Sequence, residues 1–157
     1  MFKYRKFICD IHTFLKDGSR KPRKNKPVHV YDLYRGQVIS VEQLKQLEAL
    51  QCRPNECFAF NNFTATSFDR EFAIGMALAG VNDNTNLVPV LFHITIDPIK
   101  TTHPFADIAE FSHFPGEYEI LIDLGAVLNV ERIIPSGSGM SNFVICITMQ
   151  LYSVHNS

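Results

Sequence analysis

The order in which helical and strand-like segments follow one another constrains the fold of this chain most strongly. Apolar residues recur at helical spacing over 2–16, after Ser40, and again up to Gly80. The second half is strand-like over 87–96, 118–122, 127–134 and 143–154. Early helices followed mainly by strands are typical of α+β domains. We therefore expect an α+β fold with a largely antiparallel sheet system.

Polar residues and glycines mark where several of these elements begin and end. Asp17-Gly18-Ser19 is expected to end the first helix, and Ser40 with Gln43 forms a capping-box pattern before the second. A strand over 28–34 is expected to end at Arg35-Gly36, and another strand is expected over 57–63. These boundaries leave no linker long enough to divide the chain.

The length and charge of the chain fit one ordinary globular domain. Its 157 residues include 20% charged residues, and the formal net charge is −1, so there is no global bias toward nucleic acid or membrane. We expect a single domain over 1–157, in which 1–27 forms an N-terminal helix and a basic loop. The basic residues between Arg20 and Lys26 are read as a solvated loop rather than a phosphate-contacting or localisation element. No signal peptide or transmembrane segment is recognisable, so a cytoplasmic location is the default.

The cysteines and histidines do not predict a metal site. The spacing from Cys52 to Cys57 has no second Cys or His pair at zinc-finger distance. His93, His103 and His113 likewise lack metal-ligand spacing and are read as core or surface residues. No metal is therefore expected.

Two glutamates after a Pro-Gly turn form the strongest chemical signal. Glu117 and Glu119 precede an apolar strand-like run, and residues two apart in a strand share a face. Their Cα atoms would lie about 6.5–7 Å apart. Such carboxylates can stabilise a cationic sugar-like transition state and orient or deprotonate a nucleophile. The alternative is a solvated strand face.

Two further segments carry groups that complement these carboxylates. Arg35 follows a strand and precedes Gly36, which permits close backbone approach. Residues 61–67 read Asn-Asn-Phe-Thr-Ala-Thr-Ser, and end a strand in amide and hydroxyl groups before a helix. An arginine, small polar groups and two carboxylates suit a ligand with a diphosphate, a ribose and a developing positive charge.

With these segments in place, the chain resembles the mono-ADP-ribosyltransferases of the arginine–serine–glutamate type. The likeness extends from about residue 28 to residue 134. It comprises Tyr-Arg-Gly-Gln at 34–37, Phe-x-x-Thr-Ser-x-Asp-Arg at 63–70, Leu-Phe-x-Ile at 91–94, Pro-Phe-Ala-Asp-Ile at 104–108 and Phe-Pro-x-Glu-x-Glu at 114–119. The order and spacing of these motifs carry the resemblance.

The resemblance implies two packed, mostly antiparallel β-sheets with a cleft for NAD, which serves as substrate. Arg35 matches the arginine that holds the NAD phosphates, and the backbone of Gly36 matches the position that meets the nicotinamide amide. Asn62 matches an amide that helps to hold the cofactor. Tyr34, Phe63 and Thr64, which neighbour these residues in the sequence, are also expected to bind the cofactor.

The resemblance also assigns the chemistry to the two glutamates. Glu119 matches the catalytic glutamate, which binds the nicotinamide ribose hydroxyl and stabilises the oxocarbenium ion as nicotinamide leaves. Glu117 matches the residue that engages the acceptor, and a glutamate there accompanies arginine acceptors on target proteins. A carboxylate is useful because a guanidinium is cationic and a poor nucleophile.

One position departs from the family pattern. The usual Ser-Thr-Ser stretch reads Ala65-Thr66-Ser67, so the first hydroxyl is missing. Thr66 and Ser67 are counted with the catalytic residues, and they could also cap the following helix. Three alternatives to an arginine transferase stay open. They are an NAD glycohydrolase, a catalytically weakened NAD- or partner-binding module that Ala65 supports, and an ordinary glycosidase with a carboxylate pair, which leaves Arg35 unexplained.

Overall fold

The structure is a computed structural model that describes residues 2–20, 30–53, 55–83, 86–111, 120–135 and 144–151. Three α-helices, a 3₁₀ turn and eight strands make up the secondary structure of these ranges. In chain order they are α1 (Phe2–Arg20), β1 (Tyr31–Ser40), α2 (Val41–Gln51), β2 (Phe58–Phe60), β3 (Thr64–Thr66), α3 (Arg70–Ala79), β4 (Leu87–Ile96), β5 (Phe105–Asp107), η1 (Ala109–Phe111), β6 (Ile120–Ile122), β7 (Ala126–Pro135) and β8 (Ile145–Leu151).

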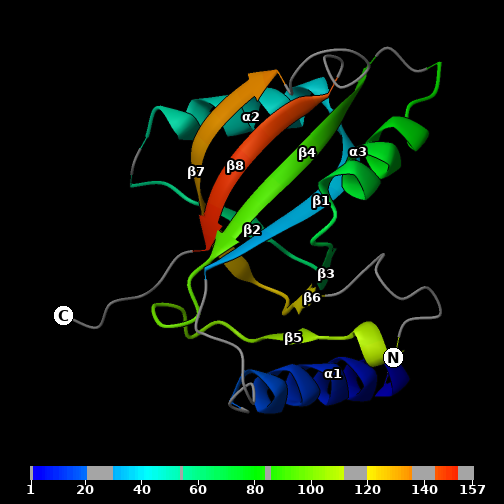
Figure 1. The fold of residues 1–157 in the computed structure, drawn as a ribbon, viewed down its shortest axis with the longest axis vertical. Helices are drawn as coiled ribbons and strands as arrows, with labels where there is room; N and C mark the ends of the chain where they lie inside the picture. Colours follow the sequence, from blue (N-terminus) through cyan, green and yellow to red (C-terminus); the bar gives the residue numbers. More distant parts are fainter. Residues whose placement is uncertain are drawn as a thin grey trace.

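The strands form two sheets (Figure 1). Sheet A has the order β1-β4-β8-β7-β2, in which β4 and β8 are parallel and the other neighbours antiparallel. Sheet B has the order β3-β6-β5 and is antiparallel throughout. The α+β class with mostly antiparallel sheets is therefore confirmed.

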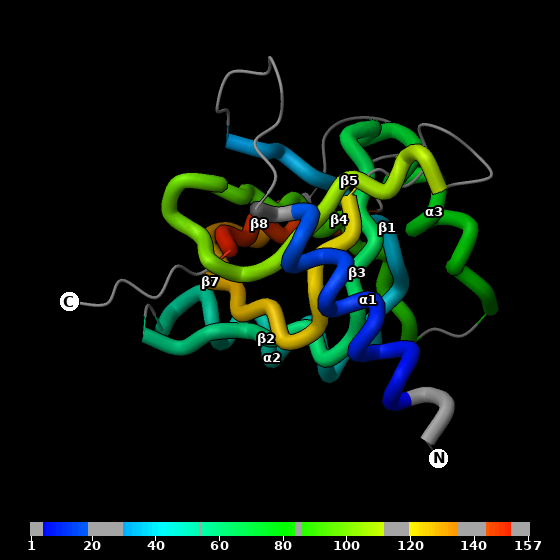
Figure 2. The backbone as a smooth tube through the Cα atoms, turned by 90° about the horizontal axis from the view of Figure 1, so that it is seen from below, coloured from blue at the N-terminus to red at the C-terminus, as the bar shows by residue number. Residues whose placement is uncertain are grey.

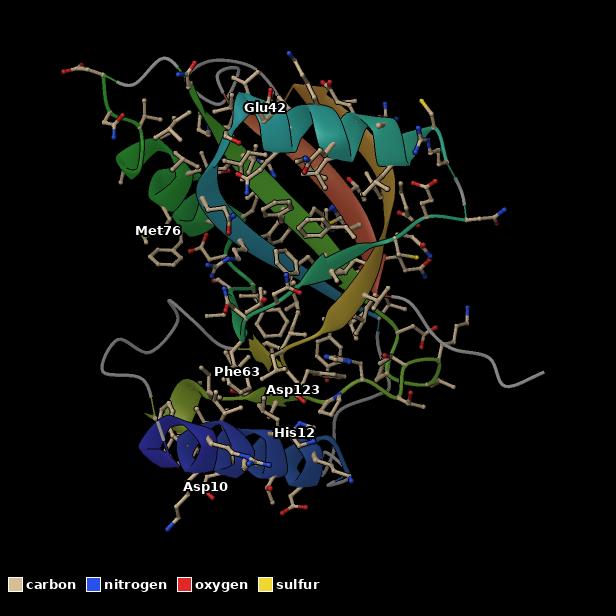
Figure 3. All side chains as sticks on the ribbon, turned by 180° about the vertical axis from the view of Figure 1, so that it is seen from behind. Asp10, His12, Glu42, Phe63, Met76 and Asp123 are labelled. Carbon is tan, nitrogen blue, oxygen red and sulfur yellow. The ribbon has the colours of Figure 1, made fainter. Side chains whose placement is uncertain are left out.

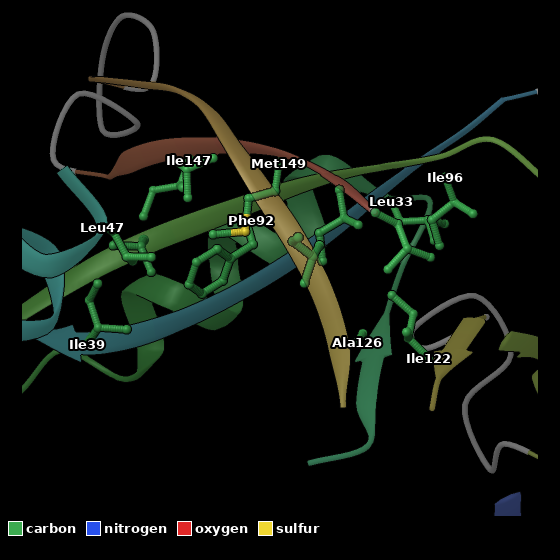
Figure 4. Packing of buried hydrophobic residues seen from close by; sticks show 14 of the residues in the cluster. Leu33, Ile39, Leu47, Phe92, Ile96, Ile122, Ala126, Ile147 and Met149 are labelled. Atoms are coloured by element: carbon green, nitrogen blue, oxygen red, sulfur yellow. The ribbon is translucent and has the colours of Figure 1, made fainter. Parts of the chain in front are cut away.

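The main core lies on the face of sheet A that is covered by α2 and sheet B. Alternate residues of β4 point into it, since successive side chains of a strand face opposite ways. Figure 4 shows Phe92 of β4 between Leu47 of α2 and Met149 of β8. On the other face, α3 packs through Ala73, Ile74 and Ala77 against a smaller cluster that includes Leu91 and Val144.

The second and third helices start as local sequence chemistry dictates. The backbone N–H of Gln43 donates to Ser40 Oγ at 3.1 Å, and the backbone N–H of Ser40 donates to Gln43 Oε1 at 2.9 Å. The predicted capping box is thus confirmed. The cap of α3 is Asp69, whose Oδ1 accepts the N–H of Phe72 at 3.0 Å, and the helix ends at Gly80 as expected.

The first helix is longer than predicted, because Gly18 lies inside it rather than beyond its end. A Cβ at Gly18 would lie 2.9 Å from the Cβ of Ala106 in β5, so the glycine lets α1 approach sheet B closely. A second contact holds α1 in place: His12 Nδ1 is hydrogen-bonded to the buried carboxylate of Asp123. Figure 3 shows His12 directed toward Asp123.

Three strand predictions need correction. The strand expected to end at Arg35-Gly36 continues to Ser40, because β1 pairs with β4 along its whole length. The strand expected over 57–63 is confined to Phe58–Phe60, and β3 and β5 were not predicted because they hold only three residues each. The basic run after Arg20, His113 and the ends of three predicted strands (28–29, 118–119, and 143 with 152–154) lie outside the described residues.

Candidate active site

A groove of about 590 Å³ opens between β1, α2 and the segment that joins β2 to β3. Of the residues predicted to bind the cofactor, Arg35, Asn62, Phe63 and Thr64 line it. One wall of the groove is apolar and is formed by Phe58, Phe60 and Phe92. The side-chain amides of Gln43 and Gln46 in α2 form a polar wall. Such a mixture of aromatic surface and a few placed polar groups is typical of small-molecule sites.

Arg35 links the two sheets at the edge of this groove. Its Nε donates to Gln37 Oε1 at 2.9 Å, and its Nη1 donates to the backbone oxygen of Ala65 in β3 at 3.0 Å. The odd-numbered residues of β1 share one face of the strand, so Arg35 and Gln37 both line the groove. These two hydrogen bonds fix the plane of a guanidinium that suits a diphosphate.

The backbone of β1 also joins the end of β3. Tyr34 N donates to Ser67 O at 2.8 Å, and Ser67 N donates to Tyr34 O at 2.9 Å. This bridge places Arg35 beside the Ala65-Thr66-Ser67 stretch. From the sequence, these two segments were expected to lie around one ligand. Ser67 is buried, and its Oγ accepts the N–H of Asp69 at 2.9 Å, so it helps to shape the turn into α3.

Thr66 connects β3 to the strand that follows the glutamate pair. It is fully buried, it lies opposite Ile120 in the antiparallel register, and its Oγ1 donates to the backbone oxygen of Ile120 at 2.9 Å. Ile120 is bonded directly to Glu119, while Glu117 and Glu119 themselves lie outside the described residues. The alternative role of Thr66 as a helix cap is wrong, since Asp69 caps α3 and the Thr66 hydroxyl joins two strands.

Gly36 has a structural role that the sequence did not reveal. A Cβ at this position would lie 1.6 Å from the backbone oxygen of Ala73 and 2.8 Å from the backbone nitrogen of Ala77, both in α3. Gly36 therefore lies where α3 crosses β1, and its missing side chain faces the helix rather than the groove. In the sequence, only the small residues of α3 could have indicated that this helix crosses β1 so closely at Gly36.

Tyr34 also points to the α3 side of β1. Its ring stacks on that of His93, with centroids 4.9 Å apart and an interplanar angle of 21°. Burial raises the pKa of the Tyr34 hydroxyl above its ordinary value, and the carboxylate of Asp32 raises the pKa further. Asp32 in turn pairs with His93 Nε2 at 2.8 Å. Tyr34 thus borders the site through its backbone, and its side chain does not line the groove.

Several groove residues were missed by sequence reasoning. Gln37 belongs to the Tyr-Arg-Gly-Gln motif but was given no role, and the alternation of β1 would have placed it beside Arg35. The polar residues of α2 and of the turn after it, Gln43, Gln46, Arg53 and Glu56, also line the groove. Their helix was predicted from its buried leucines, so its polar face carried no signal of a site.

Two searches of the described part of the chain bear on cofactors and membranes. No group of three or more His, Cys, Asp or Glu side chains there lies in an arrangement that could hold a metal ion. No helix within the described ranges is long and apolar enough to cross a membrane.

Comparison with known proteins identifies the fold. No family model matches the chain, and no curated protein sequence matches it. Solved structures do. The Salmonella SpvB ATR domain is similar with a TM-score of 0.60 and 20% identity over 95% of this chain and 72% of that one.

Two further solved structures are similar to this chain in fold. Vis, an ADP-ribosyltransferase toxin from Vibrio splendidus, gives a TM-score of 0.58 and 21% identity over 96% of this chain and 57% of that one. HopU1, an ADP-ribosyltransferase of Pseudomonas syringae, gives a TM-score of 0.55 and 18% identity over 80% of this chain and 47% of that one. The chain thus spans about half the length of these two proteins. It has the fold of the ADP-ribosyltransferases.

Proposed function

We propose that this chain transfers ADP-ribose from NAD to arginine side chains of target proteins and releases nicotinamide. The observation that carries the proposal is the hydrogen bond of 3.0 Å from Arg35 Nη1 to Ala65 O. It brings a cationic anchor at the rim of a ligand-sized groove to the strand beside β6, which begins one residue after Glu119. The ADP-ribosyltransferase fold supports the same activity.

In this proposal Arg35 binds the diphosphate of NAD, because its planar guanidinium can donate two parallel hydrogen bonds to phosphate oxygens. Asn62, Phe63 and Thr64 lie along the same groove and contribute amide, aromatic and hydroxyl contacts. Gly36 contributes only its backbone, since α3 covers the place where a side chain would stand. We also propose that residues 1–157 form a single domain.

Glu119 would stabilise the sugar cation that forms as the bond between nicotinamide and the ribose breaks. Nicotinamide leaves with the bonding electrons, and the acceptor nitrogen attacks the anomeric carbon. The hydrogen bond from Thr66 to Ile120 O supports this role, since it anchors the residue bonded to Glu119.

Glu117 would orient the acceptor guanidinium and take up the proton that it loses on transfer. The choice of arginine rests on Glu117 together with a neighbour: Vis, which shares the fold, has been crystallised with agmatine, a small guanidine compound. Target proteins that present arginine are thus the proposed partners.

Ala65 supports a second candidate function, in which transfer is weak and the chain acts mainly as an NAD glycohydrolase or as an NAD- or partner-binding module. The methyl group of Ala65 replaces a hydroxyl in the residue whose backbone oxygen accepts the Arg35 bond. Release of ADP-ribose at the same rate with and without agmatine would favour the hydrolase. NAD binding without nicotinamide release would favour the binding module.

The proposal is tested by incubating the protein with labelled NAD, agmatine and a protein lysate. Glu119→Gln should abolish both nicotinamide release and transfer, while Glu117→Gln should abolish transfer and leave some NAD hydrolysis. Glu71→Gln is the matched control, because Glu71 lies exposed on α3 and pairs only with Arg70 among the described ion pairs. Transfer by Glu119→Gln at the wild-type rate would contradict the assignment.

A further inference from the structure

The first helix, α1, carries apolar side chains that the domain does not bury. Leu15 is fully buried against the domain, but Phe7 is 63% exposed, and Ile8 and Phe14 are both exposed. Phe7 and Phe14 are seven residues apart and so share one side of the helix. Figure 2 looks onto α1 from outside the domain and shows it at the surface, on the side of sheet B.

The 3₁₀ turn η1 extends this apolar surface. Phe111 is 69% exposed, and its ring meets that of Phe14 edge to face, with centroids 5.5 Å apart. We call Phe7, Ile8, Phe14 and Phe111 the N-terminal face. Single exposed apolar residues are ordinary on protein surfaces, but a contiguous group of large ones marks an interaction site.

The same helix is the basic part of a weakly acidic protein. The sequence of α1 holds five lysines and arginines and two aspartates, a net charge of +3, whereas the whole chain has −1. Among the described ion pairs, none involves Arg5, Lys6 or Lys16, and all three are exposed. Four more basic residues follow at 21–26, outside the described residues; they are not part of the proposed surface.

We propose that the N-terminal face docks α1 onto an anionic phospholipid surface. Exposed phenylalanines beside lysines and arginines on an amphipathic helix are the pattern of helices that lie in the membrane interface. The lysines and arginines meet the anionic headgroups, and the phenyl rings enter the boundary between headgroups and acyl chains. This proposal goes beyond the proposed transferase activity and does not depend on it.

The position of α1 is compatible with a working catalytic groove. The groove is lined by β1, α2, β2 and β3, and no residue of α1 lines it. The His12–Asp123 hydrogen bond and the Gly18–Ala106 contact hold the helix on sheet B through its inner side. Docking through the exposed side chains of the N-terminal face therefore leaves the groove open to NAD.

Nucleic acid is the other anionic surface that a basic helix could meet, and the structure favours lipid. A nucleic-acid helix is bound mainly through its phosphates, which need cations rather than exposed phenyl rings.

The test is co-sedimentation of the purified full chain with vesicles of phosphatidylcholine alone or with about one third phosphatidylserine, in which surface charge attracts basic segments. We expect binding only to the vesicles that contain phosphatidylserine, and weaker binding as salt rises from about 0.1 M to about 1 M. Phe7→Ser with Phe14→Ser should lower the partition coefficient roughly tenfold or more per residue. Neutralising Arg5 and Lys6 with glutamine should lower it roughly fivefold per charge.

Met76→Ser is the matched control, because Met76 is a large apolar residue on α3, is about as exposed as Phe14 and lies far from α1 (Figure 3). It should bind vesicles like the wild type, and circular dichroism should show that every variant is folded. The proposal is overturned if the wild type does not bind phosphatidylserine vesicles at low salt, or if the double phenylalanine variant binds as well as Met76→Ser. Tighter binding to a single- or double-stranded oligonucleotide than to vesicles would also overturn it. Since no readout uses NAD, failure here leaves the proposed activity standing.

Discussion

Replacing Gly36 by alanine tests whether the packing of α3 on β1 depends on a missing side chain. The added Cβ would lie 1.6 Å from Ala73 O, 2.6 Å from Ala73 C and 2.8 Å from Ala77 N. All three are backbone atoms, so no side-chain rotation can relieve the overlap. To restore even a tight contact of about 3 Å, α3 would have to move by about 1.4 Å relative to β1.

Such a movement disturbs the tightest helix–sheet contact in the described structure. Ala73 and Ala77 are almost completely buried, and Ile74 and Leu91 belong to the same cluster. Forcing an extra methyl group into a packed core costs about 1–3 kcal/mol. Because the obstacle is backbone, we expect Gly36→Ala to cost about 3 kcal/mol or more, which corresponds to a fall in Tm of roughly 6–12 °C for a domain of this size.

Gly75→Ala provides a matched control in the same helix. A Cβ at Gly75 would have no atom within 4 Å, and the position is exposed. Alanine is the better helix former, so this variant should be more stable than the wild type by about 0.5–1 kcal/mol. Both free energies would be measured by urea unfolding followed by circular dichroism. A Gly36→Ala variant whose free energy of unfolding lies within about 0.5 kcal/mol of the wild-type value would refute the packing argument.

Three other predictions concern buried or half-buried groups. Thr66→Val should cost about 1–3 kcal/mol in urea unfolding, because the Ile120 carbonyl loses its buried donor, whereas Thr66→Ser should lose less. Asp123→Asn should weaken the attachment of α1 through His12, and faster cleavage within α1 in limited proteolysis would show it. Burial raises the pKa of the Cys146 thiol above its ordinary value of 9.0. The folded state therefore keeps that proton longer than the unfolded chain, so stability from this group is lost as pH rises above about 9, and Cys146→Ala should reduce the alkaline loss of stability.

The sequence predicted those elements whose ends are marked by a local pattern of residues. Ser40 with Gln43 predicted the start of α2, and Gly80 predicted the end of α3, because caps are short-range hydrogen-bonding patterns. The pattern of apolar residues also predicted the α+β class. These features require no knowledge of what lies across the core.

What the sequence did not predict depends on contacts between distant segments. Nothing local shows that the strand after Tyr31 continues through Gly36, since its continuation is set by pairing with β4. The three-residue strands β3 and β5 are too short to carry a periodic signal, and they exist because β6 pairs with both. Gly18 looked like a helix stop, but it serves the approach of α1 to β5.

The candidate site shows the same division. Residue types and motif order selected Arg35 and the Ala65-Thr66-Ser67 stretch, and the described structure brings them together. The sequence left open whether Thr66 caps a helix, and the structure shows that its hydroxyl instead donates to Ile120 in the neighbouring strand β6. The strand β3 and the residue after it thus make three contacts. Ala65 O accepts from Arg35, the backbone of Ser67 pairs with that of Tyr34, and Thr66 Oγ1 donates to Ile120 O in β6. A strand of three residues that joins the anchor to the segment beside Glu119 has little room for substitution. For that reason we expect exchanges that remove the Thr66 hydroxyl to impair the site more than exchanges at exposed positions of the groove.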